Sequence, residues 1–196
     1  MNPEFATARI ASRMEIEHRI YEYCHGVDRM VFTMVRHTYH ADAYDNHGAY
    51  QGGIAGLIAW MEQRHPNIEL CLHLICNVYI EFASDEHVIC ESYAVCWQRL
   101  RREAWAFDSA PDGGDDAPDT MEFSTVFRYV DHFTRRAGAW RIQHRTVVNE
   151  LGFRIPETLG QRLQNPLSWA RGKRDESDPV LLLRKQLQSE IGTALS

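Results

Sequence analysis

Residues 68–101 read IELCLHLICNVYIEFASDEHVICESYAVCWQRLR, and this stretch decides the fold. Both halves are rich in β-branched, aromatic and aliphatic side chains, which is typical of long strands. The run ASDE at Ala83–Glu86 between them is short and mostly polar, and it predicts a turn. We therefore expect an antiparallel hairpin with two long arms, residues 68–82 and 87–101.

Two more strands follow this hairpin along the chain. Residues 121–136 and 139–151 have the same strand-like composition, and they are joined at Ala137–Gly138. A run of long strands connected by short turns predicts an antiparallel sheet.

Helices precede the hairpin. Residues 8–40 carry apolar side chains at helical spacing, with a break expected near Gly26. Residues 54–65 have the same spacing, and Pro66 is expected to end that helix. Residues 44–52 between them indicate a short strand or a turn-rich crossing. Helices followed by antiparallel strands predict an α+β domain, in which the helices cover one face of a curved sheet and enclose a cavity.

The composition fits one domain with a tail. We expect the domain over residues 1–151 and a polar tail over residues 152–196, with one helix at 179–191. The tail is predicted to dock on the domain or on a neighbouring subunit. The acidic segment 109–120, rich in glycine and proline, is expected to be an exposed, mobile loop.

Charge and hydropathy exclude several classes of partner. With 21 basic and 27 acidic residues, the net charge of −6 gives no basic surface for nucleic acid. No apolar run suits a signal peptide or a membrane span, so we expect a cytoplasmic protein that binds a small molecule or another copy of itself. Five cysteines lack the spacing of a zinc knuckle or a redox pair, and we expect buried thiols: Cys24, Cys71, Cys76, Cys90 and Cys96.

Asp28 borders the apolar stripe of the first helix, beside Val27 and Val31. A carboxylate at the edge of a core is costly unless it is paired. His73, in the middle of an otherwise apolar strand, is the best candidate for its partner. A lone core histidine is more often structural, but a carboxylate that binds Nδ1 fixes the imidazole tautomer and makes Nε2 a competent base.

Three short motifs carry a family resemblance: GVDR at residues 26–29, HLICNVYIEF at 73–82 and WRIQHR at 140–145. With the glycine that follows an aromatic residue at 50–52, they resemble the SnoaL-like branch of the NTF2-like superfamily. This family of cone-shaped α+β barrels includes scytalone dehydratase, bile-acid 7α-dehydratase and hexachlorocyclohexane dehydrochlorinase. The resemblance covers residues 14–151.

The resemblance implies a catalytic dyad formed by Asp28 and His73, used without a metal or another cofactor. It also implies that Tyr23 and Arg145 donate hydrogen bonds to oxygen atoms of the substrate. Strand alternation alone favours His144 as the inward residue unless a bulge reverses it, so the resemblance decides for Arg145. An ion pair of Arg145 with Glu150 or Asp131, and a purely structural Tyr23, are the alternative readings.

Other residues are candidates for substrate binding. Glu91 is a possible second acid whose side-chain direction the sequence does not fix, and Asn46 with His47 is expected at the cavity entrance. Aromatic side chains of the strands suit a hydrophobic substrate: Trp97, Phe123, Phe127 and Tyr129. His37, His40 and Asp42 have spacings that could hold a metal, but a helix end with exposed histidines explains them, and we predict no metal site.

We predict a cofactor-independent lyase, with a dehydratase favoured, that eliminates water from a steroid-like, polycyclic or aromatic hydroxy-carbonyl compound. An isomerase or a dehydrohalogenase would use the same dyad. The alternative from another class is a non-catalytic ligand-binding protein, or an assembly subunit like the small subunits of ring-hydroxylating dioxygenases. A homotrimer is expected, because the resembling dehydratases form one and Val78, Ile80 and Phe82 are predicted to need a cover on the outer face.

Overall fold

The computed structural model describes residues 6–105, 119–155 and 170–191. The chain divides into two compact units, residues 1–155 and 156–196. The helices of the first unit are α1 (Thr7–Asp28), α2 (Phe32–His37), α3 (Ile54–Arg64), the short 3-10 helix η2 (His65–Asn67) and α4 (Arg102–Trp105). Its strands are β1 (Tyr39–Asn46), β2 (Gln51–Gly53), β3 (Ile68–Phe82), β4 (His87–Arg101), β5 (Thr120–Arg136) and β6 (Ala139–Ile155).

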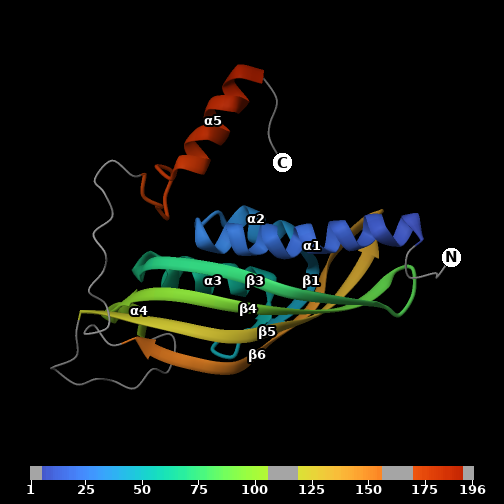
Figure 1. Ribbon diagram of the computed structural model, residues 1–196, viewed down its shortest axis with the longest axis horizontal. Coiled ribbons are helices and arrows are strands. Elements are labelled where there is room, and N and C mark those ends of the chain that lie inside the picture. Colours follow the sequence, from blue (N-terminus) through green and yellow to red (C-terminus); the bar gives the residue numbers. More distant parts are fainter. Residues whose placement is uncertain (1–5, 106–118, 156–169, 192–196) are drawn as a thin grey trace. The chain divides into compact units, whose positions relative to one another are not determined.

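The strands of the described residues form one curved sheet in the order β2-β1-β6-β5-β4-β3 (Figure 1). The β3–β4 hairpin has the predicted arms, and β5 and β6 continue the antiparallel pairing. Only β1 runs parallel to its neighbour β6. The sheet does not close, and β2 and β3 form its edges. The prediction of an α+β domain with helices on one side of an antiparallel sheet is confirmed.

The helical region breaks into two pieces near Gly26, as the sequence predicted, although α1 continues to Asp28 and the break itself falls at residues 29–31. A Cβ at Gly26 would lie 2.9 Å from the Val35 side chain, so this glycine lets α2 pack closely against α1. The helix ends instead in a turn in which Met30 has a positive φ of 57° and the Val31 amide donates to the Gly26 carbonyl. This is a Schellman arrangement with methionine where glycine is usual, which the sequence does not signal.

A bulge in β6 decides which residue of the WRIQHR motif faces inward. His132 pairs with His144 and Phe133 with Ile142, so Gln143 is the extra residue. An extra residue reverses the alternation of side chains. Arg145 is consequently buried and His144 exposed, which is the orientation that the resemblance implied.

A second irregularity, in β3, corrects the predicted outer face. The pairing with β4 shifts between Ile75 and Val78, which turns the following residues inward. Ile80 is 4% exposed, and Val78 and Phe82 pack against the core. The prediction that Val78, Ile80 and Phe82 need an external cover is therefore wrong.

The core lies between the sheet and the helices α1, α2 and α3. From α1, the residues Ile16, Ile20, Tyr23 and Val27 are at most 2% exposed. Their spacing of three and four residues places them on one face of the helix, along the sheet (Figure 1). This packing holds the C-terminal end of α1, and with it Asp28, against the sheet.

The second unit contains α5 (Pro179–Ile191), which has the predicted bounds. Asp178 precedes it, and a carboxylate oxygen of Asp178 accepts a hydrogen bond from the Val180 amide at 3.1 Å, so the helix begins with an acidic cap and a proline. The docking of this tail stays a prediction. Most of the predicted loop 109–120 lies outside the described residues, and in the parts that the structure describes no helix could span a membrane.

Candidate functional site

Asp28 and His73 are in direct contact, as the sequence predicted. Nδ1 of His73 lies 2.6 Å from Oδ1 of Asp28, and the backbone amide of His73 donates to Oδ2 at 2.9 Å. The second bond is available because β3 is an edge strand, whose outer amides have no strand partner. Two donors from one residue fix the orientation of the carboxylate, and the carboxylate in turn fixes the imidazole ring.

Burial and contact both change the proton affinity of this pair. Burial raises the pKa of the Asp28 carboxyl, although His73 acts in the opposite direction. Burial on its own lowers the pKa of His73, but the neighbouring groups Cys96, Tyr129, Cys71 and Asp28 outweigh it, and the pKa lies well above its ordinary value. His73 is therefore a stronger base than a free imidazole, and it titrates together with Asp28.

His73 lines a cavity of about 520 Å³ between the sheet and the helices. Much of its wall is aromatic or aliphatic, including Val27, Trp60, Met61, Leu100, Phe123, Phe127 and Tyr129. A volume of this size accommodates a small organic molecule. Among the residues predicted to bind substrate, the structure brings Phe127 and Tyr129 to this wall, together with Phe123.

Tyr23 lies on the same wall, as predicted, and is 1% exposed. Its hydroxyl lies 3.3 Å from Nε2 of His47, a residue of the β1–β2 connection that also lines the cavity. Nδ1 of His47 lies 2.6 Å from Oδ1 of Asp45, which is fully buried at the end of β1. Of the three histidines that line the cavity, His47 and His73 are each held through Nδ1 by an aspartate.

Arg145 does not reach the cavity wall. Its guanidinium is fully buried and forms two hydrogen bonds with Asp131, at 2.6 and 2.7 Å. Its Cζ lies 3.8 Å from the ring centre of Tyr129 and 4.3 Å from that of Tyr23. Both rings line the cavity, so they stand between Arg145 and any ligand. The pair with Asp131 was one of the alternatives at the sequence level, although there it was expected on a solvated strand.

Three other predicted binding residues also lie off the cavity wall. Glu91 pairs with Arg128 on the opposite face of the sheet, and Trp97 is 38% exposed there. The outward orientation of both side chains follows from the alternation in β4, where Cys90, Cys96 and Leu100 face inward. The Asn46 side chain accepts a hydrogen bond from the Gly48 amide at 3.1 Å and shapes the turn that carries His47.

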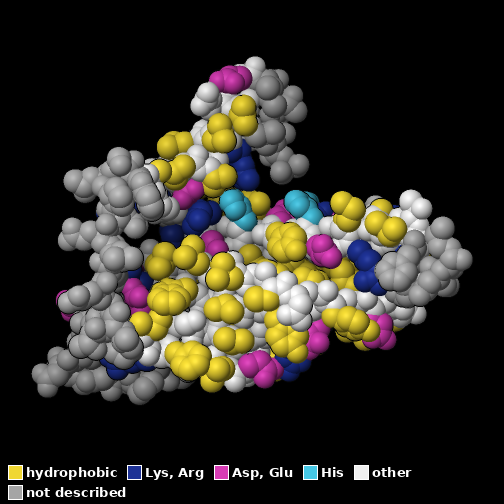
Figure 2. Space-filling model, viewed as in Figure 1, with side chains coloured by type: hydrophobic (Ala, Val, Ile, Leu, Met, Phe, Trp, Pro, Cys, Tyr) yellow, Lys and Arg dark blue, Asp and Glu magenta, His cyan; other side chains and the backbone are white. Residues whose placement is uncertain are grey.

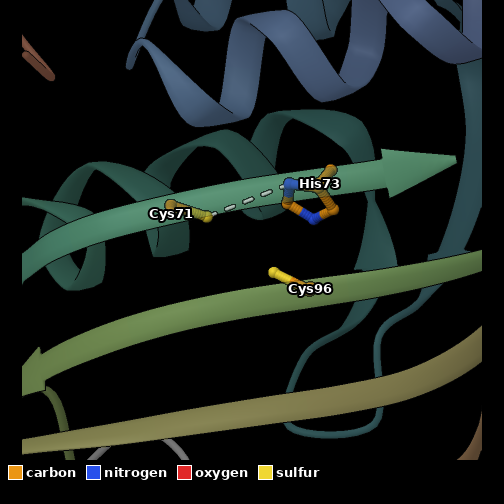
Figure 3. Close-up of side chains that lie close together, drawn as sticks. All are labelled: Cys71, His73 and Cys96. Atoms are coloured by element: carbon orange, nitrogen blue, oxygen red, sulfur yellow. Dashed lines mark hydrogen bonds between the residues drawn. The ribbon is translucent and has the colours of Figure 1, made fainter. Parts of the chain in front are cut away.

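Two cysteines of the sheet lie near His73: Cys71 on β3 and Cys96 on β4 (Figure 3). The Sγ atoms of Cys71 and Cys96 and one ring nitrogen of His73 lie within 4.8 Å of one another, close enough to be considered as metal ligands. Two features of the donors disfavour a metal. Nδ1 of His73 is already bound to Asp28, and contact with Cys71 together with burial raises the pKa of the Cys96 thiol, which favours the neutral form.

His37, His40 and Asp42, for which we predicted no metal site, each have a different partner. Nδ1 of His37 contacts Glu22 at 2.8 Å, Nε2 of His40 contacts the Thr134 carbonyl at 3.0 Å, and Asp42 binds Arg136. Each of the three side chains is thus bound to a different partner, and the three are not among the described groups whose ligand atoms lie close enough together for one metal ion.

Sequence reasoning missed Asp45 and Arg64. Asp45 and His47 are two residues apart, a spacing that puts side chains on one side of a strand, but an acid near a turn is usually solvated. Arg64 ends α3, where a basic residue is expected to face solvent, yet it is 6% exposed and lines the cavity beside Gln98. Only the packing of α3 over the sheet shows its position.

This combination of a helix-covered curved sheet and an acid–histidine pair in an apolar cavity defines a class of small α+β domains. The sequence profile of the SnoaL-like domain matches residues 8–146, and the chain belongs to this family, within the NTF2-like superfamily. No curated protein sequence matches closely enough to add to this assignment.

Solved structures of the same fold agree with the assignment. One is a candidate scytalone dehydratase from Novosphingobium aromaticivorans, with 14% identity, a TM-score of 0.61 and coverage of 84% of this chain and 98% of that one. Another is hexachlorocyclohexane dehydrochlorinase LinA-type3 from Novosphingobium barchaimii, with 18% identity, a TM-score of 0.65 and coverage of 81% and 98%. A third is the β subunit of a candidate aromatic-ring-hydroxylating dioxygenase from Novosphingobium aromaticivorans, with 16% identity, a TM-score of 0.54 and coverage of 72% and 91%. At these identities the likeness establishes the fold alone.

Proposed function

We propose that this protein is a cofactor-independent lyase, a dehydratase that eliminates water from a hydrophobic hydroxy-carbonyl compound. The observation that carries the proposal is the contact between Asp28 and His73 on the wall of an apolar cavity. A buried acid–histidine pair is expensive to maintain, and a binding protein for apolar ligands has no need of one.

In the proposed reaction His73 is the general base. Asp28 accepts the hydrogen of Nδ1 and leaves the lone pair of Nε2 for the substrate. Nε2 removes a proton from the carbon next to the carbonyl, and Asp28 stabilises the imidazolium that results. Departure of the β-hydroxyl then completes the double bond.

In the proposed reaction, the tyrosines of the cavity wall donate the hydrogen bonds to substrate oxygen atoms that the resemblance had assigned in part to Arg145. The Tyr23 hydroxyl can donate to a substrate oxygen, and the Tyr129 hydroxyl has no hydrogen-bond partner among the described residues although it is fully buried. Arg145 lies against both rings and lowers the pKa of each, in opposition to the dominant effect of burial. We assign Arg145 a positioning role, because it acts on the substrate only through these rings.

The lining of the cavity suggests the substrate class. Phe123, Phe127 and Trp60 suit an aromatic or polycyclic body, and Arg64 with Gln98 offers a polar end for a carbonyl or hydroxyl group. The test is a screen of β-hydroxy carbonyl compounds of steroid and aromatic type for enone formation. Conversion by the wild type but not by His73→Ala supports the proposal, and tight binding of several compounds without conversion of any contradicts it.

Self-association as a homotrimer is proposed on a different observation. Two mostly apolar rows cross the outer face of the sheet. One contains Leu72, Trp97 and Phe153, with Ser124 between the last two, and the other contains Leu74, Val95, Val126 and Leu151. Figure 2 shows hydrophobic side chains gathered over β3 to β6, and Leu74 and Phe153 are 60% and 51% exposed. Such a face favours contact with another copy.

Light scattering tests this association. We expect a trimer that Leu74→Arg dissociates, because the charge falls in the middle of an apolar row, whereas a monomeric wild type at micromolar concentration contradicts the proposal. The cytoplasmic location stays a prediction.

The dehydrohalogenase reading rests on the same base. A likeness in fold to hexachlorocyclohexane dehydrochlorinase supports it no more than it supports a dehydratase. The two reactions differ in the leaving group, because a halide departs as a stable anion whereas hydroxide needs a proton. The contact between Tyr23 and His47 is relevant here, because it could supply that proton.

A further inference from the structure

A second acid–histidine pair faces the cavity beside the proposed base. Oδ1 of Asp45 lies 2.6 Å from Nδ1 of His47, and Nε2 of His47 lies 3.3 Å from the Tyr23 hydroxyl. Oδ2 of Asp45 accepts a hydrogen bond of 2.6 Å from the Tyr39 hydroxyl. Asp45, His47 and Tyr23 therefore form an unbroken series from a fully buried carboxylate to a phenol on the cavity wall.

The protonation state of His47 decides where the Tyr23 hydrogen points. When His47 is neutral, its Nδ1 hydrogen is bound to Asp45, and Nε2 can only accept the hydrogen of Tyr23. When His47 is protonated, Nε2 donates to the Tyr23 oxygen, and the phenolic hydrogen is then available to the cavity. The protonated series thus presents a donor with a second proton directly behind it.

The environment of Asp45 keeps its carboxyl group ionised. Burial raises the pKa of the Asp45 carboxyl, but His47, Arg145 and Tyr39 outweigh it, so the net pKa is lowered. Asp45 consequently remains a carboxylate at neutral pH. A carboxylate at Nδ1 stabilises an imidazolium and fixes the ring so that Nε2 faces its partner.

We propose that Asp45, His47 and Tyr23 are a proton relay that protonates the departing oxygen of the substrate. As the carbon–oxygen bond breaks, the leaving oxygen takes the Tyr23 proton, and Tyr23 regains a proton from Nε2 of His47. Water is released, His47 is left neutral, and His73 holds the proton taken from carbon. Exchange of these protons with solvent restores the starting state.

This inference rests on the proposed function and extends it by naming the leaving group. A relay of this kind is useful for hydroxide, which is a poor leaving group, and has no use for a halide or a stable phenolate. It therefore favours a hydroxyl-bearing substrate over a halogenated one.

Two probes with the same carbon skeleton separate the roles. The first is the β-hydroxy ketone formed from benzaldehyde and acetone, and the second carries p-nitrophenoxide in place of its hydroxyl. Both give the same enone on elimination, and both need proton removal by His73. Only the first needs a proton on its leaving group.

We expect His47→Gln to lower kcat/KM for the hydroxy ketone by about 100-fold, and to change it for the nitrophenoxy ketone by no more than about twofold. Tyr23→Phe should give the same pattern, and the double variant should be no slower than either single variant, because members of one relay are not additive. A loss of local structure would slow both probes alike.

The matched control is His144→Gln, which removes an exposed histidine that stacks on Tyr44, away from the cavity. It should leave both probes unchanged. Equal loss of both probes in His47→Gln, or no loss of either, overturns the relay while the proposed function stands. If the wild type converts neither probe, both the relay and the proposed dehydratase activity are contradicted.

Discussion

Two buried acid–base pairs, Asp28 with His73 and Asp131 with Arg145, differ in what surrounds them. Asp28 and His73 meet at an edge strand and open onto a cavity. Asp131 and Arg145 meet across β5 and β6, both fully buried, behind the rings of Tyr23 and Tyr129. The first pair can exchange a proton with a ligand, and the second has no access to one.

The chemistry of the two bases matches this difference. An imidazole changes charge near neutral pH, whereas a guanidinium stays charged throughout the range in which proteins are folded. The pair that opens onto the cavity is suited to catalysis, and the sealed pair is suited to holding the aromatic wall in place. Each of the following predictions would sharpen this contrast or break it.

The largest effect is expected from removal of the base. His73→Ala should lower kcat by about 100-fold to 10,000-fold on a true substrate, because proton removal belongs to the rate-limiting transition state. Ligand affinity, measured by titration, should change far less. An unchanged circular dichroism spectrum and melting temperature are the controls, and equal turnover by His73→Ala would make the assignment of the base wrong.

Removal of Arg145 should act on stability first. Arg145→Leu leaves Asp131 buried without its cation, which costs about 3 to 5 kcal/mol in free energy of unfolding. The measurement is urea unfolding followed by circular dichroism.

The double variant Asp131→Leu with Arg145→Leu is the matched control. Because it removes both charges, it should recover much of the lost stability. If Arg145→Leu is as stable as the wild type, the Asp131 carboxylate is not both buried and dependent on Arg145 for its charge compensation.

The pH dependence of turnover should reflect the raised pKa of His73. The base acts in its neutral form, so kcat/KM for the nitrophenoxy ketone, whose leaving group needs no proton from His47, should rise with pH and level off only above the ordinary histidine value of 6.5. Asp28→Asn removes a carboxylate that stabilises the imidazolium, so the rising limb should move to lower pH while the plateau falls. A limb at the same pH in both proteins would mean that Asp28 does not set the proton affinity of His73.

Much of the fold could be predicted because its patterns are local. The two arms of the hairpin, the turn at Ala137–Gly138 and the helix at 179–191 follow from composition and spacing within a few residues. The end of α1 could not, because Met30 adopts a left-handed conformation that glycine usually takes. The bulge at Gln143 is also invisible to alternation, which by itself points to the wrong neighbour.

The site residues could be predicted only where a polar residue interrupts an apolar sequence pattern. An acid beside an apolar stripe and a histidine in an apolar strand suggested the Asp28–His73 contact. Asp45 and Arg64 gave no such signal, because turns and helix ends normally carry charges in solvent. Whether a charged residue there is buried depends on which element packs over it, which is a property of the whole fold.

The smallest effect is expected from Glu91, which shares β4 with the inward residue Cys96 but faces the other way. It binds Arg128, which also holds Glu150 at 2.6 Å, so Arg128 keeps one carboxylate when Glu91 is replaced. Exposed ion pairs of this kind contribute little. Glu91→Gln should therefore leave the pH profile, the turnover and the melting temperature unchanged. Asp28→Gln is the matched comparison on the inner side, and it should abolish most of the turnover. Loss of turnover in Glu91→Gln, with an unchanged oligomeric state, would mean that a group on the outer face takes part in the reaction, and the proposed division between a catalytic inner face and a non-catalytic outer face would fail.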